Sequence, residues 1–377
     1  MTILIRNVNN PYHDEKLFWP YHAQKAQTIL RGEIPSPSLI EIDPTDEGCN
    51  QSCIHCCFGS GSNRMVRKID VQKLLCFVAE AYEYGVYAYE LVGGGEPTAH
   101  PGIASIIIGI TNLAKPNCER PHIGMVTNGI LLERVFSVAH CLDFLRVSLD
   151  AADATTYSVL HGINPALNHF EKVLANIKTL VSFRGGKQVR LGYLVVPPHN
   201  HKKDAIRRFI DLSLTLGVEH VAFRPAFLKY GTDREVWQET SDIILEEQSR
   251  HRSGFILGGS GGSWENALGN QEHPSGLCRI RPLVLTIKSS GVIPSCFLYR
   301  DRLTERLAIG HISEGFLKVW FNKSHLQSIQ TFNRSSCPDV CKFYRSQRAL
   351  ERLEILNVAG SNIPVIADTE LDNPYFI

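Results

Sequence analysis

The chain has 377 residues, of which 44% are hydrophobic and 20% charged, and its 39 basic and 38 acidic residues leave a formal net charge of +1. This length can bury a core and allows roughly two to three domains. The balanced charge argues against a nucleic-acid partner. The N-terminus is too short and polar for a signal peptide, and the longest apolar stretch, residues 106–110, is too short to span a bilayer. We therefore expect a cytoplasmic protein without a membrane partner.

Short apolar runs alternate with amphipathic segments along the first two thirds of the chain. One helix is expected ahead of this alternation, at residues 14–31. The expected strands are residues 38–43, 86–92, 122–126, 144–149, 189–196 and 220–223. The expected helices are one that Asp70 caps and Gly85 ends, and residues 103–114, 130–140, 167–183 and 204–216. This alternation implies parallel strands joined by right-handed crossovers, in an open doubly wound sheet or a partial barrel.

Polar and small residues follow the C-terminal ends of these predicted strands. In both architectures these ends meet at one edge of the sheet, where active sites gather. The residues concerned are the cysteine loop 49–56, the glycine run 93–95 with Glu96 and Pro97, the turn 127–129, Ser148, Asp150 and Arg224. Their convergence is more informative than any one motif.

Three cysteines, Cys49, Cys53 and Cys56, stand in one short loop. Clustered cysteines in an intracellular chain usually bind a metal or a cofactor. Four thiolates close a cubic iron–sulfur cluster, whereas three leave one iron open to a ligand from outside the protein. The spacing therefore indicates an open [4Fe–4S] site. A zinc site completed by His55 or Cys57 is the alternative, but four ligands packed so tightly in one loop would be awkward.

The cysteine loop, the run 94–97 and the strand end 146–150 together resemble the radical S-adenosylmethionine (radical SAM) superfamily over about residues 38–225. The resemblance implies that the cluster binds the amino and carboxylate groups of S-adenosylmethionine (SAM). It also implies that one electron from the cluster cleaves the sulfonium, and that a 5′-deoxyadenosyl radical then abstracts a hydrogen atom from the substrate. A flavodoxin- or ferredoxin-type donor would supply the electron.

The resemblance also implies a set of cofactor contacts. Glycines after the second strand let the backbone approach the SAM ammonium closely, and the acid that follows them adds opposite charge. A hydroxyl and a carboxylate after the fourth strand meet the ribose, and a guanidinium after the sixth neutralises the carboxylate. The cofactor-binding residues predicted in this way are Gly94, Gly95, Glu96, Ser148, Asp150 and Arg224.

Each of these residues also has a purely structural explanation. The glycines fit a tight turn, Ser148 and Asp150 fit capping of the next segment, and Arg224 fits a structural ion pair. The sequence does not identify a catalytic residue. Cys57 abuts a predicted ligand and is a weak candidate for a thiol hydrogen donor, with a buried packing cysteine as the alternative.

A second cysteine group follows a glycine-rich stretch at residues 258–262: Cys278, Cys296, Cys337 and Cys341. A hairpin is expected from residues 283–287 and 292–297 with its turn at 289–291, then helices around residues 316–321 and 342–353. This spacing resembles the SPASM and twitch extensions of radical SAM enzymes. Four cysteines fit the shorter twitch form with one auxiliary [4Fe–4S] cluster, and a zinc knuckle is the alternative.

The predicted fold is therefore α/β, a partial (β/α)6 TIM-like barrel with a C-terminal twitch-like module of a β-hairpin and a helix. The expected domains are an N-terminal extension at residues 1–37, the barrel core at 38–240, the auxiliary-cluster domain at 255–350 and a tail at 351–377.

The predicted function is hydrogen abstraction from a natural-product substrate, such as an aminosugar or another small intermediate. An auxiliary cluster favours dehydrogenation, epimerisation or a related redox change. The alternative is a ribosomal peptide that is epimerised or cross-linked. A more distant alternative is a zinc-binding protein without catalysis.

Overall fold

The computed structural model describes most of the chain, in segments separated by gaps. The described residues are 17, 19–46, 49–56, 67–184, 189–218, 220–226, 234–251, 256–259, 264, 268, 276–296, 308–337, 341, 343–358 and 375–376. Cys57, the weak catalytic candidate, lies outside them.

One eight-stranded sheet, in the order β10-β1-β4-β5-β6-β7-β8-β9, organises the described residues, and every neighbouring pair in it is parallel. The six predicted strands are its middle six, in chain order, which confirms the predicted parallel core. The bounds are β1 Leu39–Ile42, β4 Ala88–Leu91, β5 His122–Thr127, β6 Phe144–Ser148, β7 Val189–Val195, β8 His220–Pro225, β9 Ile256–Gly259 and β10 Val284–Ile287.

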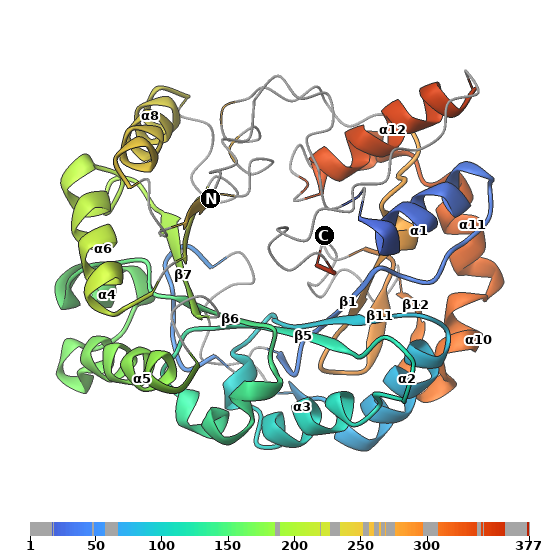
Figure 1. The fold of residues 1–377 in the computed structure, drawn as a ribbon, viewed down its shortest axis with the longest axis horizontal. Coiled ribbons are helices and arrows are strands. Elements are labelled where there is room, and N and C mark those ends of the chain that lie inside the picture. Colours follow the sequence, from blue (N-terminus) through green and yellow to red (C-terminus); the bar gives the residue numbers. More distant parts are fainter. Residues whose placement is uncertain are drawn as a thin grey trace.

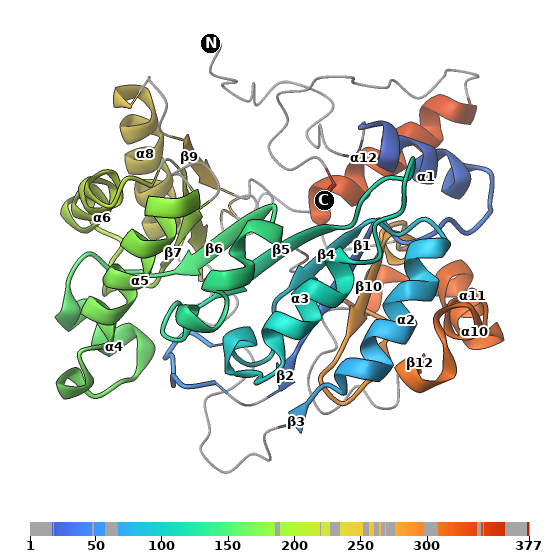
Figure 2. The same cartoon turned by 60° about the horizontal axis from the view of Figure 1, so that its bottom comes forward.

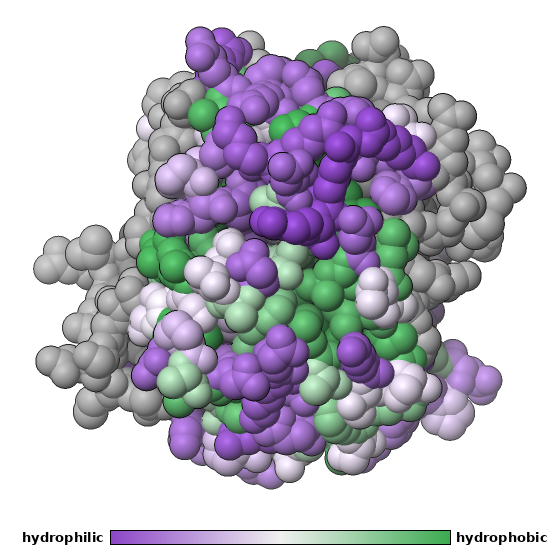
Figure 3. Space-filling view, turned by 90° about the vertical axis from the view of Figure 1, so that its left-hand side faces the viewer, coloured by the Kyte–Doolittle hydropathy of each residue, from purple (hydrophilic) through white to green (hydrophobic). Residues whose placement is uncertain are grey.

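The sheet is curved, and the helices that connect its strands lie along its convex side (Figure 1). This one-sided arrangement is that of a partial barrel rather than a doubly wound sheet. The surface over the side of α4, α5, α6 and α8 is mostly hydrophilic, with hydrophobic residues in a band across its middle (Figure 3). The helices are α2 Val71–Glu83, α3 Ile103–Thr111, α4 Ala154–His161, α5 His169–Arg184, α6 Lys203–Thr215 and α8 Arg234–Arg250.

Alternation along the strands separates an apolar face from a polar one. On β6, Leu145 and Val147 are fully buried in the core under the helices, whereas Arg146 and Ser148 are partly exposed. Since successive side chains of a strand point to opposite faces, Arg146 and Ser148 lie on the concave side. The barrel interior therefore carries the polar chemistry.

One predicted helix and one helix that was not predicted show how the structure differs from the sequence analysis. Residues 130–140 form two short 3₁₀ segments, Leu132–Arg134 and Phe136–Cys141, because Val135 between them has a φ of −121°, outside the helical range. Conversely, α4 was not predicted. It begins where the Asp153 carboxylate accepts a hydrogen bond from Thr156 N at 2.8 Å, and it ends at Gly162 in the left-handed region.

The C-terminal strands divide between two sheets. The predicted turn forms, with Gly291 at a φ of 82° and Lys288 N donating to Val292 O at 3.0 Å. However, β10 pairs with β1 at the edge of the barrel, whereas β11 (Val292–Pro294) pairs antiparallel with β12 (Ala308–His311). At the other edge of the barrel, β9 includes the first two residues of the stretch 258–262, which the sequence indicated as flexible.

The remaining helices lie beside this C-terminal region (Figures 1 and 2). They are α1 Pro20–Leu30, α10 Phe316–Trp320, α11 Lys323–Thr331 and α12 Tyr344–Val358. A small hydrophobic cluster joins Ala26 and Ile29 of α1 to Leu350 and Leu353 of α12 and to Ile280. In the part of the chain that the structure describes, we find no helix with the length and apolarity needed to cross a membrane.

Candidate active site and metal centres

The loop that carries Cys49, Cys53 and Cys56 follows β1 and rests on the end of α4. Ser52 N donates to His161 O at 3.0 Å, and Ile54 N donates to Leu160 O at 3.0 Å. The contact requires a glycine at position 162, since a Cβ there would lie 2.2 Å from Ser52 O. The left-handed φ of 57° at Gly162 equally favours glycine. The end of α4 thus fixes the backbone of the cysteine loop through these two hydrogen bonds.

The three thiols of this loop fit a metal centre that takes three ligands from the protein. Cys49 is exposed, and Cys53 and Cys56 are half-buried. Burial raises the pKa of the Cys53 thiol, and the neighbouring Cys49 and Asp150 raise it further. A bound cation offsets this cost, because the thiolate is the form that ligates metal. The site is suited to bind iron or another thiophilic metal.

Two histidines complete the surroundings of Cys53. Its Sγ lies 3.2 Å from Nδ1 of the buried His161, and the ligand atoms of Cys53, His55 and His161 lie within 4.8 Å of one another. Nε2 of His161 lies 3.2 Å from Leu149 O and 3.7 Å from the Asp150 carboxylate, which is 3.9 Å from Nε2 of His55. His55 was considered only in the zinc alternative, and His161 was not predicted as a site residue.

The glycine run after β4 is joined to the loop after β5 through Glu96, which is 2% exposed. One carboxylate oxygen accepts from Thr98 N at 2.9 Å and from Thr127 Oγ1 at 2.6 Å, and the other accepts from Asn128 N at 2.7 Å. Burial raises the pKa of Glu96, while these hydrogen bonds oppose the shift. Glu96 therefore fixes two neighbouring loops at the strand ends.

Asn128 was interpreted from the sequence as turn chemistry, and it does form a turn, with its Oδ1 accepting from Ile130 N at 3.1 Å. Its Nδ2 also donates to Asn50 Oδ1 at 2.6 Å and lies 3.9 Å from Cys49 Sγ. It is thus a contact of the cysteine loop that sequence reasoning missed. Its position at the end of a predicted strand was the available signal.

Asp150 is buried just beyond β6 in a left-handed conformation, with a φ of 59°. Its Oδ1 accepts from Leu194 N at 2.7 Å, and Asn200 Nδ2 donates to its backbone oxygen at 2.9 Å. Burial raises the pKa of Asp150 to about 7, whereas the Leu194 hydrogen bond and the charges of Arg146 and Arg224 oppose the shift. A buried carboxyl in a strained backbone conformation is typical of a functional site.

The other predicted cofactor contacts lie on the same side of the sheet. Ser148 ends β6 next to Gly192 of β7, and Arg224 lies on β8 in register with Leu194. Burial lowers the pKa of Arg224, and its Nε has no hydrogen-bond partner among the residues that the structure describes. The structure thus brings the cysteine loop, the glycine run with Glu96 and the residues after β5, β6 and β8 to one edge of the barrel.

All four C-terminal cysteines, Cys278, Cys296, Cys337 and Cys341, line one cavity. Arg281 and Arg334 line it too. Burial raises the pKa of Cys337, and the two arginines oppose the shift. α12 contributes Tyr344 and Gln347 to the wall. Four thiols in a cavity with two cationic side chains fit a closed, anionic metal–thiolate centre.

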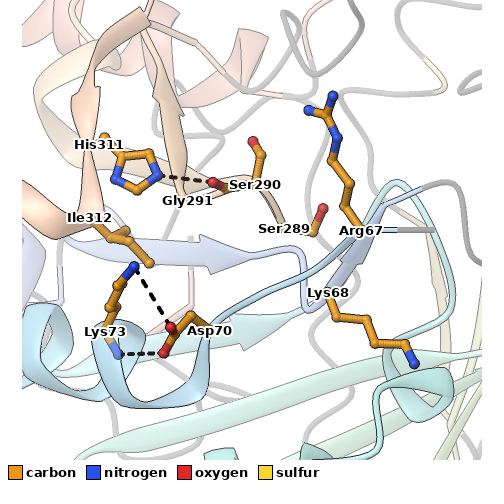
Figure 4. Close-up of a pocket in the computed structure, with 9 residues that line it drawn as sticks. All are labelled: Arg67, Lys68, Asp70, Lys73, Ser289, Ser290, Gly291, His311 and Ile312. Carbon is orange, nitrogen blue, oxygen red and sulfur yellow. Dashed lines mark hydrogen bonds and ion pairs between the residues drawn. The ribbon is translucent and has the colours of Figure 1, made fainter. Parts of the chain in front are cut away.

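A separate surface pocket of about 410 Å³ lies between the start of α2 and the turn before β11 (Figure 4). Arg67, Lys68 and Lys73 give it a basic rim. The Asp70 side chain caps α2, and its Oδ2 lies 3.8 Å from Lys73 Nζ. Its lining includes none of the predicted site residues. This pocket is therefore separate from both cysteine groups.

Comparison with known sequences shows one family match and several relatives. The model of the Radical SAM superfamily matches residues 45–210. PqqA peptide cyclase of Methylorubrum extorquens is 24% identical over 205 residues, 51% of this chain and 49% of that protein. GTP 3′,8-cyclase of Synechococcus sp. is 29% identical over 136 residues, 34% of this chain and 38% of that protein. The chain thus spans about half the length of PqqA peptide cyclase and less than half the length of GTP 3′,8-cyclase.

Two groups of solved structures share the fold. SuiB of Streptococcus suis bound to its precursor peptide SuiA has a TM-score of 0.61 at 16% identity, over 92% of this chain and 80% of that one. The protein anSMEcpe with bound SAM and a peptide has a TM-score of 0.57 at 13% identity, over 82% of this chain and 87% of that one. At these identities the likeness establishes the fold.

Proposed function

We propose that the chain, whose residues 45–210 match the model of the Radical SAM superfamily, binds a [4Fe–4S] cluster and SAM and uses them to abstract a hydrogen atom from a peptide substrate. The observation that carries the proposal is the gathering of Cys49, Cys53 and Cys56 with the SAM-binding candidates at one edge of the barrel. When bound, the cluster supplies the electron that cleaves SAM to a 5′-deoxyadenosyl radical.

The chain's own residues have distinct roles in this proposal. Cys49, Cys53 and Cys56 hold the cluster, and the loop's anchoring on α4 keeps them in place. The backbone at Gly94 and Gly95 receives the SAM amino group, and Glu96 holds that loop against the loop after β5.

Three further residues complete the proposed cofactor site. Ser148 and Asp150 bind the ribose, and Arg224 binds the carboxylate, for which its Nε, without a partner in the described part of the chain, is suited. Asp150 is held by Leu194 N, so its orientation is set before the cofactor arrives.

A peptide is favoured over the small intermediate that we put first from the sequence. One curated relative is named a peptide cyclase, and both groups of structures with the same fold include complexes with peptides. A small intermediate such as an aminosugar is the second candidate. In either case we expect a redox-type outcome and a flavodoxin- or ferredoxin-type electron donor.

The C-terminal cysteines are assigned to an auxiliary [4Fe–4S] cluster of the twitch type. The support is that Cys278, Cys296, Cys337 and Cys341 line one cavity. We propose residues 38–240 as the radical SAM core and 255–350 as the auxiliary domain, with 1–37 and 351–377 as flanking segments. In the described residues, α1 and α12 pack together beside this second domain.

The test is anaerobic reconstitution with iron and sulfide, followed by reduction in the presence of SAM. The wild-type protein is expected to form 5′-deoxyadenosine, and Cys53→Ala to form none while it keeps metal at the C-terminal cysteines. Cys76→Ala is the matched control, since Cys76 is an exposed cysteine on α2. Equal 5′-deoxyadenosine from Cys53→Ala and wild type would contradict the assignment.

A zinc protein without catalysis is the more distant alternative, and one observation favours it. Cys53, His55 and His161 present three ligand atoms within 4.8 Å of one another, which suits a mononuclear ion. The two candidates differ in colour and metal content. Iron and sulfide with broad visible absorption support the radical SAM function, whereas colourless protein with one zinc bound at Cys53 supports the alternative.

A further inference from the structure

The surface pocket between the start of α2 and the turn before β11 has no role in the proposed function (Figure 4). None of the described residues that line it belongs to a cysteine group or to the proposed SAM contacts. Its basic side chains are those of Arg67, Lys68 and Lys73, and Asp70 is the one acid in the described lining. With His311 neutral, the pocket thus carries an excess of two positive charges.

The turn that follows β10 forms one wall of this pocket and is fixed by hydrogen bonds. Gly291 N donates to Lys288 O at 2.8 Å. Nδ1 of His311 accepts from Ser313 N at 3.1 Å, so Nε2 carries the proton of the neutral ring and donates to Ser290 O at 2.9 Å. The backbone of this wall is therefore held in place without a ligand.

Ser289 carries an unsatisfied hydroxyl in the same wall. The residue is 2% exposed, and its Oγ has no hydrogen-bond partner in the described part of the chain. In Figure 4 this hydroxyl and that of Ser290 lie between His311 and Arg67. A buried hydroxyl without a partner destabilises the folded protein until a ligand accepts its hydrogen bond. Ser289 is therefore suited to donate to a bound anion.

The positive charge lies on segments beside this turn. Arg67 and Lys68 make up β3, which pairs antiparallel with β2 (Thr45–Asp46), the short strand that follows β1. Lys73 lies in the first turn of α2, with its Nζ 3.8 Å from Asp70 Oδ2. Asp70 also accepts from Lys73 N at 3.0 Å as the cap of the helix, so its carboxylate is already engaged and offsets only one of the three cations.

These groups together match a dianionic oxyanion. Hydroxyl, ammonium and guanidinium groups donate hydrogen bonds to phosphate and carboxylate oxygens, and a guanidinium can donate two parallel bonds. An excess of two positive charges matches a phosphate, or two neighbouring carboxylates, better than a single carboxylate. The described lining contains no Phe, Tyr or Trp on which a nucleobase could stack.

We propose that this pocket binds a dianionic oxyanion group, either a phosphate or a pair of neighbouring carboxylates, with Ser289, Arg67 and Lys73 as donors. The site goes beyond the proposed function, because none of its residues is assigned to a cluster or to SAM. It lies past the C-terminal ends of β1 and β10, which pair side by side in the sheet, and the cysteine loop follows the same end of β1. An acidic peptide bound there would therefore lie at the active-site edge of the barrel.

The experiment is equilibrium dialysis of the anaerobically reconstituted full chain against radiolabelled probes. The probes are inorganic phosphate, acetyl-Glu-Glu-amide and, as the uncharged control, acetyl-Gln-Gln-amide. We expect the wild type to bind phosphate or the Glu probe and not the Gln probe. Ser289→Ala should bind about tenfold more weakly, which is the effect of losing one hydrogen bond to a charged group. Lys73→Gln should bind about threefold more weakly, because its charge is exposed to solvent.

Two variants outside the pocket are matched controls. Ser38 is also a buried serine whose Oγ has no partner among the described residues, so Ser38→Ala removes an equivalent hydroxyl elsewhere. Lys172 is an exposed lysine 3.3 Å from a carboxylate, that of Glu133, so Lys172→Gln removes a charge as Lys73→Gln does. Both controls should bind the probes as the wild type does.

Urea unfolding without a probe separates binding from structure. Because the hydroxyl of Ser289 has no partner in the described part of the chain, Ser289→Ala should be at least as stable as the wild type. A loss of stability in this variant would assign the hydroxyl to the fold and overturn the proposal. Equal binding by the wild type, Ser289→Ala and Lys73→Gln would overturn it as well.

The two charged probes distinguish the sources of the oxyanion. Binding of phosphate alone would identify a free phosphate or a phosphate ester as the ligand, and binding of the Glu probe would identify an acidic peptide. Either result supports the site, whereas binding of neither probe overturns it. Absence of 5′-deoxyadenosine formation with probe binding intact would contradict the proposed function alone.

Discussion

The three cysteines of the first group come from one loop, residues 49–56, whereas the four of the second come from segments spread between residues 278 and 341. The first group follows β1, which lies beside the edge strand β10, and is fixed by the end of α4. The second lines a cavity that α12 helps to enclose. Three ligands in a local loop suit a centre that must accept an outside ligand, and four ligands from distant segments suit a closed one.

This difference predicts that the two centres can be lost separately, and Cys296→Ala tests it with the largest expected effect. Its cavity would lose one ligand, so iron content should fall, and product formation should stall while some 5′-deoxyadenosine is still formed. Metal analysis and product analysis under anaerobic turnover check both. Cys118→Ala, at an exposed cysteine, is the control. Normal product formation by Cys296→Ala would remove the redox role of the second centre.

The anchoring of the first centre on α4 can be broken by Gly162→Ala. The new Cβ would lie 2.2 Å from the backbone oxygen of Ser52 and adds strain at a positive φ, which by itself costs roughly 1–3 kcal/mol. We expect lower stability and lower iron occupancy of the cysteine loop, with the C-terminal metal retained.

Gly32→Ala is the matched control for that variant. Gly32 also has a positive φ, of 77°, but no atom of the described residues lies within 4 Å of its added Cβ. It should show the strain without the loss of iron. Thermal unfolding and metal analysis distinguish the two effects, and equal iron occupancy in both variants would contradict the role of the α4 contact.

A smaller effect, on the pH dependence of folding stability, is expected from the carboxyl of Asp150, beside the first centre. Its pKa of about 7 in the folded protein lies above its ordinary value of 3.8, so the folded state binds the proton more tightly than the unfolded state. The contribution of the protonated Asp150 carboxyl to folding stability is fully present below pH 3.8 and is lost as the pH rises through 7. Between pH 5 and 8 the metal-free wild type should lose roughly 2 kcal/mol more stability than Asp150→Asn.

Urea unfolding of both proteins at the two pH values measures this difference. Asparagine keeps an oxygen that can accept from Leu194 N, so the comparison isolates the charge. Parallel loss of stability in the two proteins would show that Asp150 is not the group responsible.

Much of the barrel could be predicted from the sequence because its signals are local. The apolar runs gave all six core strands, and the Asp70 cap and Gly85 gave the limits of α2. α4 is the instructive failure. Asp153 and Gly162 mark its two ends as clearly as Asp70 and Gly85 mark those of α2, but the helix between them has only a weak apolar face.

The candidate site also combines features that local sequence signals predict with contacts that they do not. The spacing of Cys49, Cys53 and Cys56 determined the predicted cluster, because ligands within one loop are close whatever the rest of the chain does. The sequence also indicated which strand ends would converge, since parallel strands bring their C-terminal ends to one edge. It could not show that His161 and Asn128 reach the sulfurs of that loop.

What only the tertiary structure decided are the contacts between segments far apart in the chain. β10 pairs with β1 instead of completing a hairpin with β11, and α1 packs on α12. The sequence by itself determined the six core strands, the cysteine spacing and the family resemblance, because turn preferences, hydrophobic periodicity and ligand spacing act over a few residues. Pairing and packing across the chain depend on which buried surfaces fit together, and that is settled only when the whole chain folds.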